Sequence, residues 1–188
     1  MNRAGFGIRL GALLIDGIIL FILYKIVGVI VAPHIDPTGK TFQEVFAAAL
    51  AAARRVALFY SFIQLAYMST EVFKAASPGK MILKLKIISE TGEAAQPNQL
   101  WTRFAVKNAA TLVGILWAIS GLGIVYAVQV LAGLAVFGGC FMALGAKKQA
   151  LHDVIAKTAV LQPAAAGVSA QGFQPVMPAS PVPPPTQE

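Results

Sequence analysis

The chain consists of long apolar runs separated by short polar or proline-containing stretches. The first apolar run covers residues 8–32, which exceeds the roughly 20 residues that a helix needs to cross a bilayer. Residues 41–75 can form one long helix, and its part 56–75 is apolar enough to be a second span. The pattern therefore predicts an integral membrane protein.

The apolar stretch 101–145 is too long for a single span, because a helix rises about 1.5 Å per residue. The sequence Ser120-Gly-Leu-Gly123 supplies a break, which divides the stretch into spans at about 104–119 and 122–145. Polar residues load the start of the first of these spans, so a re-entrant helix is the alternative to a full crossing there. We predict an all-α membrane fold with four transmembrane helices.

Two short segments beside these helices are predicted to be strands. Apolar and basic residues alternate over Leu83-Lys-Leu-Lys-Ile87, a period of two that favours a strand at 83–89 over an interfacial helix. Residues 154–161 follow the last span and have the composition of a second short strand. We expect the two strands to pair as a small cytoplasmic β-sheet.

Composition and charge agree with a membrane protein. Hydrophobic residues make up 57% of the chain and charged residues only 12%, and a soluble domain this apolar would expose large apolar patches. The net charge of +7 needs no nucleic-acid partner, because cytoplasmic loops of membrane proteins collect Lys and Arg. Basic residues gather at 74–107 and 147–157, which places both stretches and both termini in the cytoplasm.

The last part of the chain has a different composition from the rest. Residues 163–188 are rich in Ala, Pro, Ser and Gln and cannot bury enough apolar surface to fold. We therefore expect a transmembrane domain over residues 1–162 and a disordered tail after it.

Asp16 is the most informative position, because it lies in the middle of the first apolar run. A charged side chain near the bilayer centre costs at least ~2.5–3.5 kcal/mol. Arg9 shares its helix face, since residues seven apart point the same way, but lies ~10 Å away along the axis. Each therefore needs a further partner, and the candidates cluster at the cytoplasmic side: Glu71, Arg103, Lys107 and Asp153.

Two functions fit a charge network of this kind. A membrane-embedded carboxylate can exchange H⁺ for a metal cation as it is exposed to alternate sides of the membrane. Alternatively, the network only fixes helix packing in a non-transporting scaffold or assembly partner. Four short spans are few for a transport path, so we expect a homo-oligomer in the lipid bilayer.

An enzyme is the least supported class. The sequence contains no nucleophile–base motif and no phosphate-binding loop, and a single cysteine excludes a cysteine-based metal site. We expect no catalytic residues, no cofactor and no bound metal.

Four blocks, in order along the chain, resemble a known family. They are Gly7-Ile-Arg-Leu-Gly-Ala-Leu-Leu-Ile-Asp16, Ser77-Pro-Gly-Lys-Met-Ile-Leu-Lys-Leu-Lys-Ile-Ile88, Arg103-Phe-Ala-Val-Lys-Asn108 and Gln149-Ala-Leu-His-Asp-Val-Ile-Ala-Lys-Thr-Ala-Val160. Over about residues 4–162 the chain resembles the RDD family, small and mostly prokaryotic membrane proteins named for one arginine and two aspartates.

This resemblance implies that the named residues are Arg9, Asp16 and Asp153, and that the protein lies in the inner membrane of a bacterial cell. Some members of the family are associated with Na⁺(Li⁺, K⁺)/H⁺ exchange, so the resemblance adds antiport to the possible functions.

Overall fold

The first helix, α1 (Phe6–Val31), is apolar on nearly its whole surface. The computed structural model describes residues 2–162, and the predicted tail lies outside them. The buried residues of α1 are Ala12, Asp16 and Leu20, which are four apart and so form one narrow stripe. Long apolar side chains elsewhere on α1 point outward, and Val29 is 86% exposed. Such a surface suits contact with lipid rather than with water.

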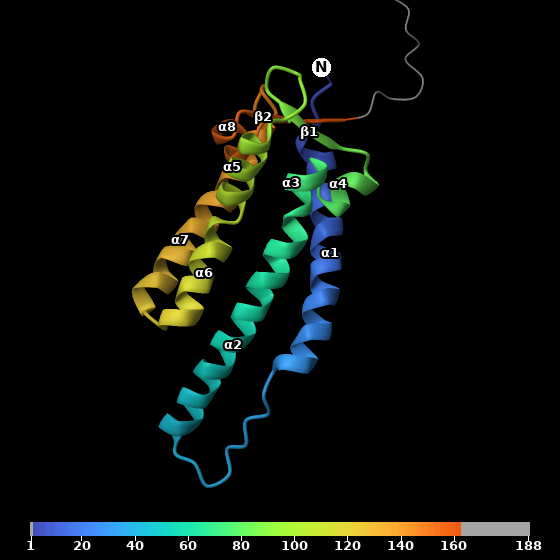
Figure 1. Cartoon of the computed structure of the whole chain (residues 1–188). Coiled ribbons are helices and arrows are strands. Elements are labelled where there is room, and N and C mark those ends of the chain that lie inside the picture. The colour runs from blue at the N-terminus through green and yellow to red at the C-terminus, as the bar shows by residue number, and fades with distance from the viewer. Residues whose placement is uncertain (1, 163–188) are drawn as a thin grey trace, which may run out of the picture.

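Helix α2 (Phe42–Met68) lies beside α1 (Figure 1). It begins with a capping box, in which the Thr41 hydroxyl accepts from the Glu44 backbone and the Glu44 carboxylate accepts from the Thr41 backbone. The Tyr24 and Tyr60 rings stack with centroids 4.5 Å apart and join the two helices. Helix α3 (Thr70–Lys74) follows Ser69, so the helix predicted at 41–75 is nearly continuous and ends at Lys74.

A shorter helical hairpin packs on α2. It consists of α6 (Ala109–Ser120) and α7 (Gly123–Cys140), joined at Gly121 with a φ of +70°, which confirms the break predicted there. Helix α7 continues into the 3₁₀ helix η1 (Phe141–Leu144). At the far end of α6, Arg54 of α2 donates to the carbonyl oxygens of Ala118 at 3.0 Å and Ile119 at 2.6 Å.

Helix α5 (Pro97–Lys107) precedes α6, and the two are separated at Asn108. The predicted span 104–119 is therefore divided between two helices. The apolar helix α6 has 12 residues, which gives a length of about 18 Å against the ~30 Å of a hydrocarbon core. Three helical segments are long and apolar enough to cross a membrane, namely Phe6–Val31, Phe42–Lys74 and Gly123–Leu144. A fourth crossing stays a prediction.

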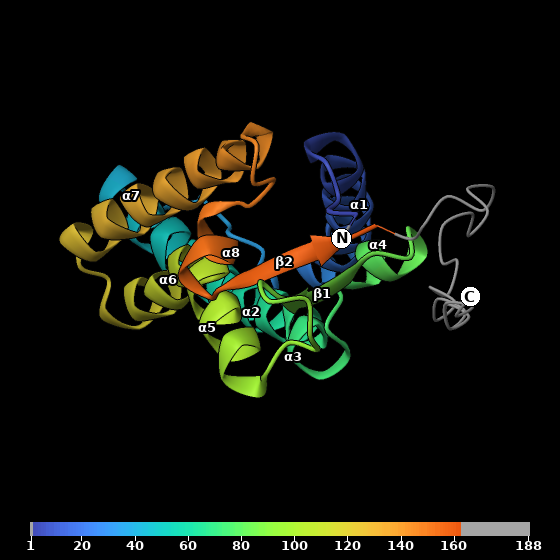
Figure 2. The same ribbon diagram turned by 90° about the horizontal axis from the view of Figure 1, so that it is seen from above.

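A two-stranded sheet lies at the end of the bundle that holds the N-terminus (Figures 1 and 2). Strand β1 (Lys86–Ser89) pairs antiparallel with β2 (Thr158–Leu161), which confirms that the two predicted segments pair. Both strands are shorter than predicted. Helix α4 (Pro78–Ile82) and a turn occupy the chain before β1, and α8 (Leu151–Ile155) and a turn occupy it before β2.

The core of the described chain lies under this sheet. Ile87 and Val160, paired across the two strands, are both fully buried with Ala4, Ala12, Val72, Leu85 and Leu100 close to them. The N-terminal segment joins the same end, because the Ala4 backbone N–H donates to the Val160 carbonyl at 2.8 Å. Helices α3, α4, α5 and α8 surround this core (Figure 2). They carry the buried polar residues Glu71, Lys80, Arg103 and Asp153.

Candidate functional site

Asp16 is buried between α1, α2 and α4, with 3% of its surface exposed. One carboxylate oxygen, Oδ1, accepts from the Tyr67 hydroxyl at 2.7 Å and from the Gly79 backbone N–H at 2.7 Å. The other oxygen, Oδ2, accepts from the Ser77 hydroxyl at 2.6 Å. All three donors are neutral. Within residues 2–162, no Lys, Arg or His side chain forms an ion pair with this carboxylate.

The sequence Ser77-Pro-Gly-Lys80 is responsible for the close approach of α4 to Asp16. Pro78 opens α4, where its missing N–H leaves no unpaired donor. Gly79 then lies directly against α1, since a Cβ atom there would be 2.3 Å from the Ala12 carbonyl oxygen and 2.9 Å from the Asp16 carboxyl carbon. Only glycine lets the backbone come this near, and its N–H thereby reaches the carboxylate.

Asp153 forms a second, separate centre, in which the charges are paired. Its side chain is fully buried and forms ion pairs with Arg9 and Arg103. Arg9 also donates to the backbone carbonyls of Ala4 at 3.1 Å and Lys148 at 2.7 Å. Asp153 therefore ties α1 to α5 and α8.

Glu71 of α3 is buried beside this pair and is surrounded by cations. Its carboxylate contacts Lys80 Nζ at 2.5 Å, Lys107 Nζ at 2.7 Å and Arg103 Nε at 3.4 Å. Arg103 thus bridges Glu71 and Asp153, and the Nη1 atom that contacts Asp153 also donates to the Thr158 hydroxyl at 3.2 Å. Burial lowers the pKa of Lys80 well below its ordinary value. The negative charge of Glu71 raises this pKa, whereas the positive charges of Arg103 and Lys107 lower it further.

The sequence-predicted residues thus divide into two groups. Arg9, Glu71, Arg103, Lys107 and Asp153 come together in one network, which we call the cationic network and which also includes Lys80.

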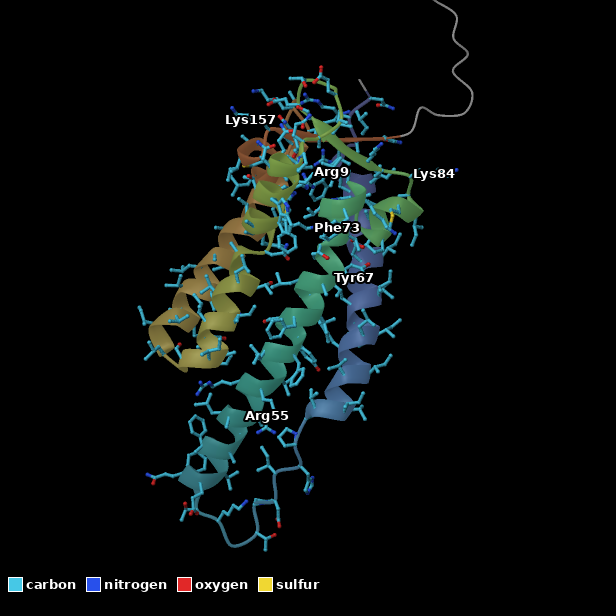
Figure 3. All side chains as sticks on the ribbon, in the orientation of Figure 1. Arg9, Arg55, Tyr67, Phe73, Lys84 and Lys157 are labelled. Atoms are coloured by element: carbon cyan, nitrogen blue, oxygen red, sulfur yellow. The ribbon has the colours of Figure 1, made fainter. Side chains whose placement is uncertain are left out.

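Asp16 does not join the cationic network. Its actual partners, Tyr67 and Ser77, were not singled out from the sequence, because they lie 51 and 61 residues away and carry no charge. Arg9 and Tyr67 lie at different depths of the bundle (Figure 3). Asp16 and the cationic network are thus separate centres.

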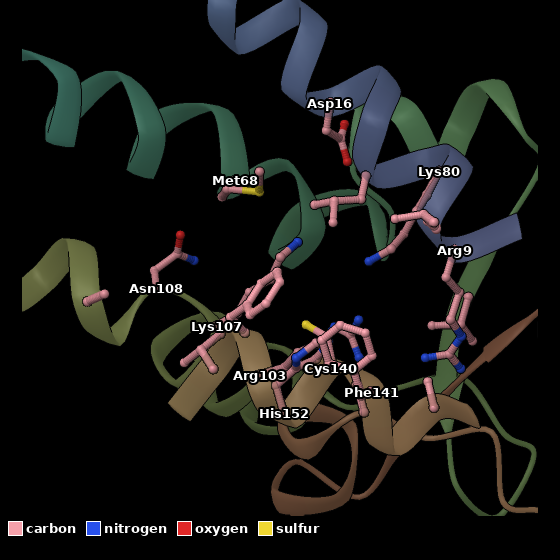
Figure 4. Close-up of a pocket in the computed structure, with 18 of the residues that line it drawn as sticks. Arg9, Asp16, Met68, Lys80, Arg103, Lys107, Asn108, Cys140, Phe141 and His152 are labelled. Atoms are coloured by element: carbon pink, nitrogen blue, oxygen red, sulfur yellow. The ribbon is translucent and has the colours of Figure 1, made fainter. Parts of the chain in front are cut away.

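A cavity of about 550 Å³ connects the two centres (Figure 4). Asp16 lines one part of it, and all four basic residues of the cationic network line another. Its remaining walls are mostly apolar and include Leu10 and Leu13 of α1 and Val136 and Phe137 of α7. The cavity lies between α1 and α7, since residues of both helices line it. Helix α7 packs on α6, and α6 packs on α2. Helix α1 contacts η1, which follows α7.

His152 of α8 also lines this cavity, beside Arg103 (Figure 4). Its Nδ1 atom is buried and has no hydrogen-bond partner within the described part of the chain. Burial lowers the pKa of His152 well below its ordinary value, and the nearby charges of Arg103, Lys107 and Lys80 act in the same direction. The imidazole is therefore neutral at physiological pH.

Comparison with known proteins yields a family but no individual relative. Neither the curated proteins nor the solved structures contain a match to this chain. The sequence model of the RDD family, in contrast, matches residues 3–157, a range that includes both aspartates, Arg9 and the whole cationic network. This confirms the resemblance predicted from the four sequence blocks: the chain belongs to the RDD family.

Proposed function

We propose that this membrane protein exchanges a monovalent cation, such as Na⁺, for H⁺, and that Asp16 is the group that binds them in turn. One observation carries the proposal. Of the three buried carboxylates among residues 2–162, Glu71 and Asp153 have cationic partners, whereas Asp16 has only neutral donors.

A buried carboxylate without a cationic partner keeps a charge that the surrounding apolar medium penalises. Three hydrogen bonds reduce this penalty but leave the negative charge in place. A proton or a small cation removes it. The hydroxyls of Tyr67 and Ser77 suit both states, because a hydroxyl can donate to the carboxylate or turn and offer its oxygen to a cation.

The cavity supplies a route to Asp16, since the carboxylate forms part of its lining. Access from the opposite side of the membrane requires a movement of α1 against its neighbours. We propose that a homo-oligomer provides the surface for that movement, because so few spans enclose little transport path. The basic residues around the sheet support a cytoplasmic location for this end of the bundle, with both termini inside.

The test is transport by the full chain in liposomes with a pH-sensitive dye in the lumen. An imposed Na⁺ gradient should change the lumenal pH, and Asp16→Asn should abolish the change. Asp36→Asn is the matched control, since Asp36 lies in the exposed loop between α1 and α2. A wild-type protein that leaves the pH unchanged, or a change that survives Asp16→Asn, contradicts the proposal.

The second candidate is a non-transporting scaffold or assembly partner. It is favoured by the cationic network, whose ion pairs tie α1, α3, α4, α5 and α8 together. In that case the wild-type protein moves no ions, and Asp16→Asn lowers the melting temperature or partner capture. If Asp16→Asn leaves both unchanged, the scaffold function fails.

A further inference from the structure

We propose that the basic end of the cavity binds the phosphate of an anionic lipid, with the lipid's acyl chains along the apolar wall between α1 and α7. This inference goes beyond cation exchange and does not depend on it, because it concerns the other end of the cavity.

The first argument is charge. The cationic network contains Arg9, Lys80, Arg103 and Lys107 but only two carboxylates, Glu71 and Asp153. The cluster is largely buried and keeps one uncompensated positive charge when Lys80 is neutral, and two when Lys80 is protonated. All four basic side chains line the same cavity, so an anion placed there would be close to each of them. Buried charges are usually balanced, and a bound phosphate is the simplest group that balances this cluster.

The second argument is independent of charge counting. His152 is 7% exposed, lines the cavity and has a buried Nδ1 atom without a partner among the described residues. Buried polar nitrogens normally have a hydrogen-bond partner. A phosphate oxygen next to Arg103 and Lys107 would supply one by accepting a hydrogen bond from the imidazole Nδ1–H.

The third argument favours a lipid over a free phosphate. The cavity is about 550 Å³, a size typical of ligand sites and much larger than one phosphate group. Its walls beyond the basic end are mostly apolar, and the wall residues Leu13 and Phe137 are 49% and 64% exposed. These side chains lie on segments apolar enough to cross a membrane. Basic pockets between membrane helices are known sites for anionic headgroups.

The experiment measures lipid binding to the full chain in detergent by native mass spectrometry. Three probes are compared: phosphatidylglycerol, phosphatidylcholine with the same acyl chains, and inorganic phosphate. We expect phosphatidylglycerol to bind about tenfold more tightly than phosphatidylcholine. Inorganic phosphate should displace neither lipid at comparable concentration.

A matched pair of variants locates the site. Lys107→Gln removes one charge from the cavity while Glu71 keeps Lys80 and Arg103, and it should weaken phosphatidylglycerol binding about fivefold. Lys74→Gln makes the same chemical change at an exposed position outside the cavity and should leave binding unchanged.

Equal binding of the two lipids would overturn the proposal, as would equal effects of the two substitutions. Displacement of phosphatidylglycerol by inorganic phosphate at equal concentration would show a headgroup site without a lipid wall, which also contradicts it. The wild-type lipid comparison decides the matter even if Lys107→Gln fails to fold. Because no ion gradient is used, the outcome is separate from that of the transport test.

Discussion

The backbone N–H of Gly79 donates to the carboxylate of Asp16 at 2.7 Å, across 63 residues of sequence. The contact joins α4 to the buried stripe of α1 and exists only because position 79 has no side chain. It is the point at which the Ser77-to-Lys80 segment and the aspartate of α1 meet, and the arrangement of the two centres depends on it.

Gly79→Ala should therefore destabilise the protein. The added methyl group would overlap the Ala12 carbonyl, which belongs to backbone and cannot rotate away, so α4 must shift. We expect a loss of about 1–3 kcal/mol, measured as a lower melting temperature in detergent. Gly17→Ala on the same helix as Asp16 is the control, because nothing lies within 4 Å of its Cβ position. Equal melting temperatures for the two variants would contradict this packing.

Arg103→Met should have the largest effect on stability of any substitution in the cationic network. Arg103 contacts both carboxylates of the cationic network, and its loss leaves Asp153 with Arg9 as its remaining ion-pair partner of full charge. Breaking a buried pair on one side costs about 3–5 kcal/mol. Denaturant unfolding checks this value, and Arg55→Met at an exposed position of α2 is the control. A loss of unfolding free energy no greater than that of the control would exclude a structural role for the contacts of Arg103 with Glu71 and Asp153.

Arg54→Met should loosen the end of α6. The Arg54 guanidinium donates to two carbonyl oxygens in the last turn of that helix, where a cation also stabilises the helix dipole. We expect a loss of about 1–2 kcal/mol and faster hydrogen exchange at residues 118–121. Arg55→Met removes the same charge from the next position, which is exposed, and should leave exchange there unaltered.

Stability should fall as the pH drops below about 6.5, and His152 should be responsible. The pKa of His152 is lowered in the folded protein, so between that value and the ordinary one only the unfolded chain binds the proton. Protonation then favours unfolding, by up to about 1.4 kcal/mol per pH unit. Melting temperatures between pH 5 and 7.5 should show this slope in wild type and lose it in His152→Gln.

His34→Gln is the control for the pH series, because His34 is exposed in the loop after α1. It should keep the wild-type slope. A wild-type melting temperature that is flat across this range, or a slope that persists in His152→Gln, would contradict a neutral buried imidazole.

The sequence predicted the helices and the charged network well because both leave strong local signals. Apolar runs set the helices α1, α2 and α7, and charges near apolar segments are usually buried together with opposite charges. Arg103 and Asp153 were therefore identifiable before their contact was seen. The pairing of β1 with β2 was predictable because residues alternate in the first segment and because both segments were expected on the same side of the membrane.

Two features were not predictable from local signals. Asp16 is separated from the cations because neutral donors, Tyr67 and Ser77, satisfy it, and a single hydroxyl has no distinctive pattern in a sequence. The segment 104–119 is interrupted at Asn108, whose backbone has a φ of −101° and a ψ of 15° and whose side chain donates to the Phe104 carbonyl at 2.9 Å. A hydropathy profile does not detect a helix break caused by a single polar residue such as Asn108.

The ion pair between Arg9 and Asp153 joins positions 144 residues apart. At a synthesis rate of roughly 5–20 residues per second, Arg9 is added to the chain about 7–30 s before its partner is made. During that interval the Arg9 guanidinium lacks its ion-pair partner Asp153. Assembly of the domain is completed only when α8 and β2 have been made. A product truncated before them lacks the Arg9–Asp153 ion pair and should be degraded readily by proteases.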